Sequence, residues 1–208
     1  PKASVRDRDG QLLIAKFPRK DDEWPVTRWE AATLALAEAA GVEVPAWRLE
    51  LVLKKPVVML RRFDRAASRR VPFMSGLTAL GAADNDARSY VDLAEVLRRE
   101  GCEVYRDLRQ LWRRVVFNLL VSNTDDHLRN HGLLREPKGW RLAPAYDLNP
   151  MPVDVRPRVH ALAVDGSDGG ASLESALLAA GAFGLKPPEA RALAREVGSA
   201  LAKWRAVA

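Results

Sequence analysis

Three side chains in this sequence have the types and spacing needed to hold a magnesium nucleotide: Asp125, Asn130 and Asp147. On a helix, Asp125 and Asn130 would lie roughly 140° apart, so they can meet at one ligand only from a loop. The stretch Asn123-Thr124-Asp125-Asp126 is typical of a turn. We therefore predict a loop at residues 123–130. In it Asp125 would act on an acceptor hydroxyl, and Asn130 with Asp147 would bind Mg²⁺ through oxygen.

Lys16 closes an apolar stretch that predicts a β-strand over residues 11–17. Residues alternate between the two faces of a strand, so Lys16 shares a face with Ile14. Protein kinases hold ATP phosphates with a strand lysine, combined with a catalytic Asp and a metal-binding Asn and Asp. The alternative is an edge lysine that extends into solvent. The residues around Asp125 favour the phosphate role for Lys16.

Glu30 has two interpretations, which the sequence leaves open. It lies three residues after Thr27, at the start of a helix predicted over residues 28–40, and the pair fits a capping box. The carboxylate of the first helix in kinases instead orients the strand lysine. One side chain cannot fully satisfy both roles. Gly41 is expected to end this helix.

His127 and His131 are spaced four apart, which raises the question of a transition-metal site. A third ligand would have to come from Asp125, Asp147 or His160. Asp-Asp and Asn-His are poor sequences for a helix interior, so we do not expect the two rings to share a helix face. We expect His127 to border the nucleotide or to stabilise the loop, and His131 to be a surface or internally hydrogen-bonded residue.

The remaining pattern predicts a bilobal α+β fold. The N-terminal lobe, residues 1–65, should contain a hairpin turning at Asp9-Gly10, the helix at 28–40, and strands at 47–53 and 57–63. The C-terminal lobe, residues 66–208, should be mostly helical. It begins with an irregular segment at 65–86 and contains helices at 90–97, 108–120, 173–180 and 188–204, with short strands at 132–134 and 140–142. In the last helix we expect the Trp204 side chain to be buried.

Composition sets outer limits on this interpretation. The chain has 208 residues, 48% of them hydrophobic, a formal net charge of +6 and a single cysteine, Cys102. A single cysteine excludes an internal disulfide and fits a reducing cytoplasm. We expect no membrane span and no secretory leader. Because the sequence starts at Pro1 rather than at Met, we expect a segment upstream. The spread of arginines favours surface charge over a nucleic-acid site.

Several short stretches occur together in an order that resembles the HipA family. These bacterial serine/threonine kinases act as toxins of type II toxin–antitoxin pairs. The stretches are Pro1-Lys2-Ala3, Ile14-Ala15-Lys16-Phe17-Pro18, Glu30 with Ala40-Gly41-Val42-Glu43-Val44-Pro45, Arg62-Phe63-Asp64-Arg65, Asn123-Thr124-Asp125-Asp126-His127-Leu128-Arg129-Asn130 and Leu142-Ala143-Pro144-Ala145-Tyr146-Asp147.

The resemblance implies a kinase-like fold, ATP and Mg²⁺ as cofactors, and transfer of the γ-phosphate to a protein Ser or Thr. Lys16 would contact the phosphates, Asp125 would be the catalytic Asp, and Asn130 and Asp147 would hold the metal. The hinge between the lobes, Arg61 to Phe63, would touch adenine, and His127 and Tyr146 would line the nucleotide pocket. The family's partners include a HipB-like helix-turn-helix antitoxin, DNA reached through that antitoxin, and an aminoacyl-tRNA synthetase as the phosphorylated protein.

The sequence departs from the family in two places. The hinge position that is often Glu in the family is Arg61. The family's Gly-rich phosphate loop is absent from the sequence and is expected upstream of Pro1. Two alternatives to a protein kinase are a phosphotransferase acting on small molecules and an inactive basic module that binds an antitoxin or nucleic acid. Indifference to Asp125→Asn would identify the inactive module.

Overall fold

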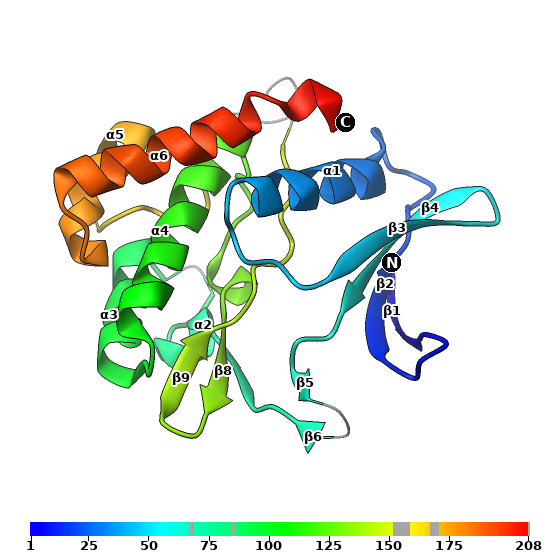
Figure 1. Ribbon diagram of the computed structural model, residues 1–208, viewed down its shortest axis with the longest axis horizontal. Coiled ribbons are helices and arrows are strands. Elements are labelled where there is room, and N and C mark those ends of the chain that lie inside the picture. The colour runs from blue at the N-terminus through cyan, green and yellow to red at the C-terminus, as the bar shows by residue number, and fades with distance from the viewer. Residues whose placement is uncertain (67–68, 85, 152–158, 167–170, 208) are drawn as a thin grey trace.

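A four-stranded antiparallel sheet forms the N-terminal part of the chain. In the computed structural model, which describes residues 1–66, 69–84, 86–151, 159–166 and 171–207, the strands lie in the order β1-β2-β4-β3. Their bounds are β1 Lys2–Arg6, β2 Leu12–Lys16, β3 Trp47–Val52 and β4 Lys55–Arg61. The sheet lies on one side of the molecule and most helices lie on the other (Figure 1).

The two hairpins of this sheet turn differently from the sequence prediction. Between β1 and β2 the loop spans residues 7–11, because the Asp7 carboxylate accepts hydrogen bonds from the amides of Asp9 and Gln11, at 3.1 and 2.8 Å. The predicted two-residue turn at Asp9-Gly10 is therefore wrong. Between β3 and β4, Leu53 and Lys54 make the turn, with φ values of 50° and 64°. Positive φ at both positions is the geometry of a type I′ turn.

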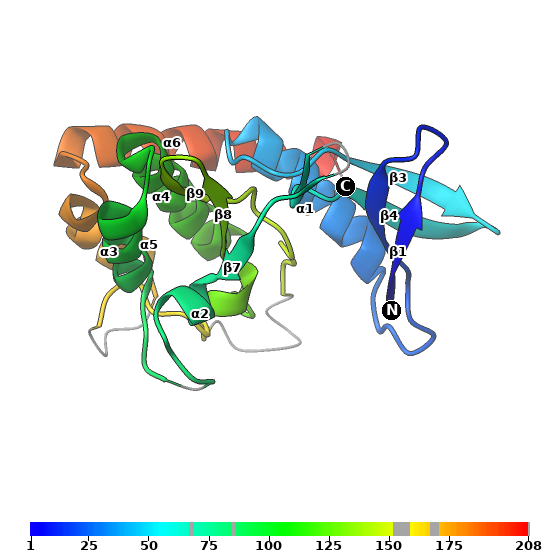
Figure 2. The same ribbon diagram turned by 90° about the horizontal axis from the view of Figure 1, so that it is seen from below.

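Helix α1, Val26–Ala39, packs against β4 and links the sheet to the helical part. It begins directly after Pro25 and has no side-chain cap, so the predicted capping box of Thr27 and Glu30 is wrong. Both side chains are buried instead. Gly41, with φ of 72°, follows the helix as predicted. Figure 2 shows α1 between the sheet and the remaining helices.

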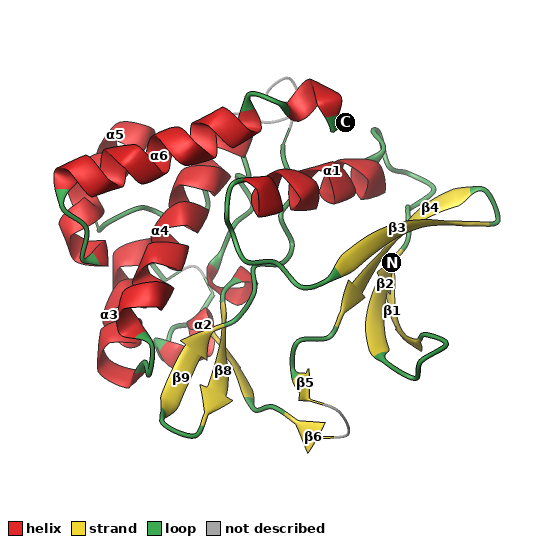
Figure 3. Ribbon diagram, viewed as in Figure 1, coloured by secondary structure: helices red, strands yellow, loops and turns green. Residues whose placement is uncertain are grey.

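The C-terminal part is mostly helical (Figure 3). Its helices are α2 Gly76–Ala79, α3 Tyr90–Glu100, α4 Val104–Val121, α5 Leu173–Leu178 and α6 Pro187–Leu201, with 3₁₀ turns η1 Leu128–Asn130, η2 Ala179–Phe183 and η3 Trp204–Ala206. The segment predicted as irregular contains the hairpin of β5 Arg65–Ala66 and β6 Arg69–Arg70, then β7 Phe73–Ser75 and α2. Strand β7 pairs with β8 Gly132–Glu136, which pairs with β9 Gly139–Leu142.

The hydrophobic core is continuous from α1 and β4 through α3, α4 and α6. Trp112 on α4 is fully buried and lies 5.4 Å from the ring of Phe183. Trp204, predicted to be buried with the last helix, lies in η3 after α6 and is 38% exposed, so that prediction is wrong. Its ring lies 6.3 Å from that of Trp29 on α1, so it covers the end of the core. Among the described residues, none of the helices combines the length and apolar character that crossing a membrane requires.

Candidate active site between the two lobes

Lys16 lies where the sheet meets the helical part. Strand β2 runs between β1 and β4, so Lys16 is on an interior strand and the edge-lysine alternative is wrong. Leu13 and Ala15 are buried on one face of β2, which turns Ile14 and Lys16 toward the other. The Lys16 Nζ forms ion pairs with the carboxylates of Glu30 on α1 and Asp147 in the C-terminal part.

The charges of this group shift the pKa values of Lys16 and Glu30. Burial lowers the pKa of Lys16, but the carboxylates of Glu30 and Asp147 together raise it further, so the net shift is upward and the amine stays charged. Burial raises the pKa of Glu30, and Lys16 offsets part of that shift. Glu30 therefore pairs with the lysine, as the second interpretation of this residue predicted. It is 4% exposed, so it depends on Lys16 for compensation of its charge.

The predicted loop at residues 123–130 is confirmed as a non-helical turn followed by η1. Helix α4 ends at Ser122, whose φ of 58° turns the chain away from the helix axis. Asp125 is exposed, and no other described residue contacts its carboxylate in a hydrogen bond or ion pair. Asn130 is tied back to this residue, because its Nδ2 donates to the Asp125 carbonyl at 3.3 Å. The loop thus holds Asp125 and Asn130 close together.

Asp147 is held by an unusual backbone conformation. Its φ of 55° lies in the left-handed region, which few residues other than glycine occupy. The preceding segment is fixed to the N-terminal part, since the Ala145 amide donates to the Glu43 carbonyl at 2.7 Å. The Tyr146 hydroxyl donates to the Arg129 carbonyl at 2.7 Å. Burial raises the pKa of Tyr146, and Asp147 adds to that shift.

Two neighbouring cavities meet at Lys16. One, of about 470 Å³, is lined by all the predicted site residues except Asp125 and Glu30: Lys16, Arg61, Phe63, His127, Asn130, Tyr146 and Asp147. The other, of about 530 Å³, is lined by Lys16, Glu30 and Asp125 together with Trp24 and Asn149. After the roles predicted for their lining residues, we call the first the nucleotide cavity and the second the acceptor cavity. Asp125, the residue predicted for the acceptor hydroxyl, therefore lines only the second cavity, Glu30 lies there with it, and Lys16 lines both.

Aromatic rings form one wall of the nucleotide cavity. The ring of Phe63 lies 5.7 Å from that of Tyr146 and 6.1 Å from that of Phe73. Phe73 belongs to β7 and was missed by the sequence analysis, because it lies in the segment predicted as irregular. An aromatic wall suits the face of a nucleotide base.

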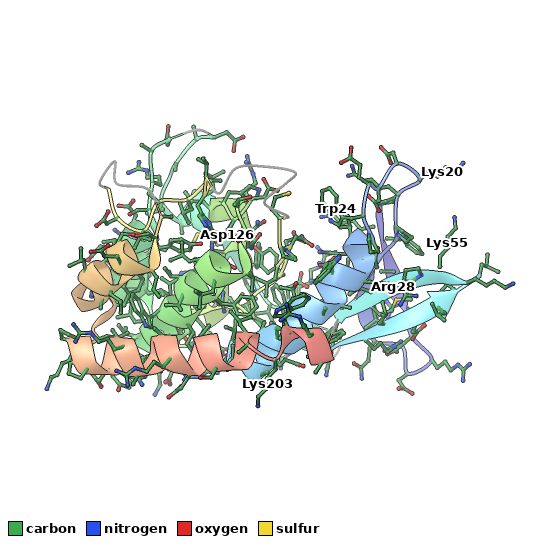
Figure 4. The ribbon with its side chains drawn as sticks, turned by 90° about the horizontal axis from the view of Figure 1, so that it is seen from above. Lys20, Trp24, Arg28, Lys55, Asp126 and Lys203 are labelled. Carbon is green, nitrogen blue, oxygen red and sulfur yellow. The ribbon has the colours of Figure 1, made fainter. Side chains whose placement is uncertain are left out.

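A second group that the sequence analysis missed lies behind the loop. Asp126 is 2% exposed and accepts hydrogen bonds from His131 Nε2 at 2.8 Å and Asn118 Nδ2 at 2.9 Å, and from the Tyr90 hydroxyl. Figure 4 shows Asp126 inside the helical part. Asn123 joins the group through a 3.1 Å hydrogen bond to Asn118. The loop is therefore anchored from within, directly beside Asp125. His131 is internally hydrogen-bonded and not a surface residue.

The oxygen donors present fit a magnesium ion better than zinc. Asn130 and Asp147 both line the nucleotide cavity, and the amide nitrogen of Asn130 is engaged by Asp125, which leaves its oxygen for a metal. Mg²⁺ is commonly bound by one or two such side chains plus substrate phosphates. The described residues contain no group of three His, Cys, Asp or Glu side chains suited to a metal. His131 is buried with Asp126, so the zinc alternative has no support.

Similar proteins were found by sequence and by structure. Two curated relatives are named as putative kinases: Y4mE of Sinorhizobium fredii, 30% identical over 146 residues, covering 65% of this chain and 33% of the relative, and a Haemophilus influenzae protein, 24% identical over 158 residues, covering 68% and 45%. The chain thus spans less than half the length of either relative.

Solved structures with the same fold include two kinase-related proteins. The HipA of Shewanella oneidensis, solved with HipB and operator DNA, has a TM-score of 0.78 at 19% identity and covers 100% of this chain and 57% of its own. The proinflammatory kinase CtkA of Helicobacter pylori has a TM-score of 0.63 at 16% identity, covering 99% and 90%. The bilobal kinase-like fold is therefore confirmed. The family model for the HipA-like C-terminal domain matches residues 1–204. This chain belongs to the family of HipA-like C-terminal domains.

Proposed function

We propose that this chain carries the catalytic region of an ATP- and Mg²⁺-dependent kinase that phosphorylates Ser or Thr hydroxyls of a protein. The observation that carries the proposal is the position of Lys16, paired with Glu30 and Asp147 at the junction of the nucleotide and acceptor cavities. Membership in a HipA-like family and the similarity to relatives named as kinases support it.

Each residue has a defined task in this proposal. Lys16, oriented by Glu30, binds the phosphates, and the aromatic wall receives the base. Asn130 and Asp147 hold Mg²⁺, which when bound neutralises charge on the phosphate oxygens. Asp125 orients the acceptor hydroxyl and takes its proton as the oxygen bonds to the γ-phosphorus and the bond from that phosphorus to the ADP oxygen breaks. Arg61 and His127 line the nucleotide cavity, and we assign them to base and phosphate contacts respectively.

The same proposal extends to partners. The similar HipA was solved with HipB and operator DNA. By analogy we assign this chain a HipB-like antitoxin, DNA contact through that antitoxin, a cytoplasmic location and a role in a toxin–antitoxin pair. An aminoacyl-tRNA synthetase is the protein substrate that the family resemblance suggests.

Calorimetric titration with ATP, with and without Mg²⁺, tests the nucleotide site. We expect Mg²⁺-dependent binding that weakens at least about tenfold in Asp147→Asn, an energetic loss of about 1.4 kcal/mol. The matched control is Glu196→Gln, which removes an exposed charge paired with Arg113 outside both cavities and should bind like the wild type. Binding that ignores both Mg²⁺ and Asp147 would refute the proposed site.

Phosphoryl transfer to a protein substrate tests Asp125 separately. Asp125→Asn should retain Mg²⁺-dependent ATP binding and lose transfer by about 10² to 10⁴-fold, the usual contribution of a general base. Transfer at the wild-type rate in this variant would exclude the assigned role. ATP binding without any protein phosphorylation, but with turnover on small hydroxyl compounds, would identify a small-molecule phosphotransferase.

A further inference from the structure

A strongly cationic cavity lies beside the nucleotide cavity, and of its lining residues the proposed reaction uses only Arg61. Its volume is about 580 Å³, and its lining, besides Gly10, Gln11 and Leu12, contains one acidic residue, Asp9, and five arginines: Arg6, Arg61, Arg62, Arg65 and Arg70. We call it the arginine cavity. Arg61 and Arg62 also line the nucleotide cavity, so the two spaces adjoin at the hinge.

The arginines come from separate elements that converge on one end of the N-terminal part. Arg6 ends β1, Arg61 ends β4, and Arg65 and Arg70 belong to β5 and β6. Figure 1 shows the β1–β2 loop and the β5–β6 hairpin reaching the same end of the molecule. Arg65 and Arg70 are direct partners in the β5–β6 register. Like charges placed opposite each other destabilise a hairpin, so the fold itself gives no reason for this pair.

Part of this positive charge is balanced within the protein. Asp64 accepts two hydrogen bonds from Arg62, at 2.9 and 2.6 Å, and forms a 2.5 Å ion pair with Arg65. These contacts hold two guanidinium groups in place. Arg6 donates to the Gly10 carbonyl at 2.9 Å, which fixes it against the loop without neutralising it.

The remaining charge is available to a ligand. Within the part of the chain that the structure describes, Arg6, Arg61 and Arg70 are in no ion pair with a carboxylate. All three are exposed. Guanidinium groups bind phosphate oxygens in a planar, two-pronged geometry.

We propose that the arginine cavity binds the phosphate backbone of a nucleic acid strand, without help from an antitoxin. Arg6, Arg61 and Arg70 come from three strands and have no carboxylate partner among the residues that the structure describes. They surround a space much larger than one phosphate, which fits a ligand with several phosphates in a row. The net charge of +6 adds long-range attraction for such a polyanion. The sequence analysis favoured plain surface charge for these arginines, but their convergence on one cavity makes a binding site the better explanation.

Fluorescence anisotropy with labelled single-stranded 20-mers, one of RNA and one of DNA, tests the proposal on the purified chain. The informative variant is Arg6→Gln with Arg70→Gln. The matched control is Arg191→Gln with Arg195→Gln, because these exposed arginines on α6 give the same charge change far from the cavity. Neither pair belongs to the proposed kinase site, so ATP binding should be unchanged in both. Thermal unfolding confirms that each variant is folded.

Removing two phosphate contacts should weaken strand binding about 20-fold at 0.1 M salt and reduce the salt-dependence slope by about 1.4, while the control pair stays within about twofold of the wild type. The ratio of RNA to DNA affinity identifies the kind of strand. Equal losses in both pairs, or no binding by the wild type, would overturn the proposal. So would a poly-glutamate peptide that binds as tightly as the strands and is equally sensitive to the Arg6 and Arg70 changes.

Discussion

Asp126 and His131 form a buried hydrogen bond of 2.8 Å, and each side chain is only 3% exposed. Burial alone would raise the pKa of Asp126, but His131 and the hydrogen bonds from its ring and from Tyr90 lower it, and the net shift is downward. Asp126 is therefore a carboxylate at neutral pH. It fixes the loop from beneath, while its neighbour Asp125 faces the acceptor cavity.

Replacing Asp126 by Ala should destabilise the protein by about 3 kcal/mol, because Tyr90, Asn118 and His131 would lose their shared buried acceptor. Chemical denaturation measures this loss. The control is Glu196→Ala, which removes an exposed partner of Arg113 and should change the unfolding free energy little. If both variants unfold at the same denaturant concentration, the buried group does not anchor the loop.

Lys16 and Glu30 should be energetically coupled. Lys16→Met leaves the buried carboxylate of Glu30 without its nearest cation and should cost about 3 kcal/mol. Adding Glu30→Gln should restore much of that loss, because no charge then remains buried at the position. A double-mutant cycle measured by denaturation gives the coupling. The exposed pair Arg48 and Glu50 serves as the control cycle, and coupling no larger than in that pair would contradict the expectation.

Titration of Asp107 should make the stability of the protein depend on pH with a sign opposite to that of a typical paired carboxylate. Burial raises its pKa from 3.8 to about 6, despite the hydrogen bond from the Leu142 amide and the nearby cations. The folded state therefore holds its proton more tightly than the unfolded chain, so its contribution to stability is full below about pH 4 and declines until about pH 6. Wild type should lose stability relative to Asp107→Asn across this range. If the difference in unfolding free energy between these two proteins does not change with pH, burial does not dominate the pKa of Asp107.

Gly132 controls the aromatic wall of the nucleotide cavity. A Cβ at this position would lie 2.2 Å from Cε2 of Phe73, so the ring must move away in Gly132→Ala. Phe73 is 43% exposed and can swing outward, so we expect little loss of stability. The Phe73 ring would lose its contact with the base, at a cost of about 1 kcal/mol. Calorimetry should then show roughly fivefold weaker Mg²⁺-ATP binding. Phe73→Ala is the companion variant. If the affinity for Mg²⁺-ATP is unchanged in both variants, the Phe73 ring does not contact the nucleotide.

The local elements that place the candidate site were predictable from the sequence. The apolar stripe of α4, the loop after it and the exposure pattern of β2 all depend on short-range periodicity. The ion pair of Lys16 with Asp147 was not predicted: the sequence analysis only placed both residues at the same nucleotide, and they are 131 positions apart. A contact over that separation leaves no mark in the short-range pattern of the sequence.

The residues that the sequence analysis missed are those whose partners are distant. Asp126 was interpreted only as a turn residue. Its hydrogen bond with Tyr90 spans 36 positions, so the local sequence gives no sign of it. One signal for it was available: Asn118 interrupts the apolar stripe of α4 between Phe117 and Leu119, and a polar side chain there needs a buried partner. Phe73 had no such signal, because its strand is three residues long and is formed by pairing with β8.

The ion pair between Lys16 and Asp147 also has a consequence for the order in which the chain folds. The sheet of β1 to β4 is built from two short hairpins joined by the pairing of β2 with β4, whereas the ion pair joins residues 131 positions apart and requires a costlier closure of the intervening chain. During synthesis the sheet can form well before Asp147 leaves the ribosome. A partly made chain therefore has Lys16 in place without Asp147, so the cluster of Lys16, Glu30 and Asp147 is completed only after the sheet that carries the lysine.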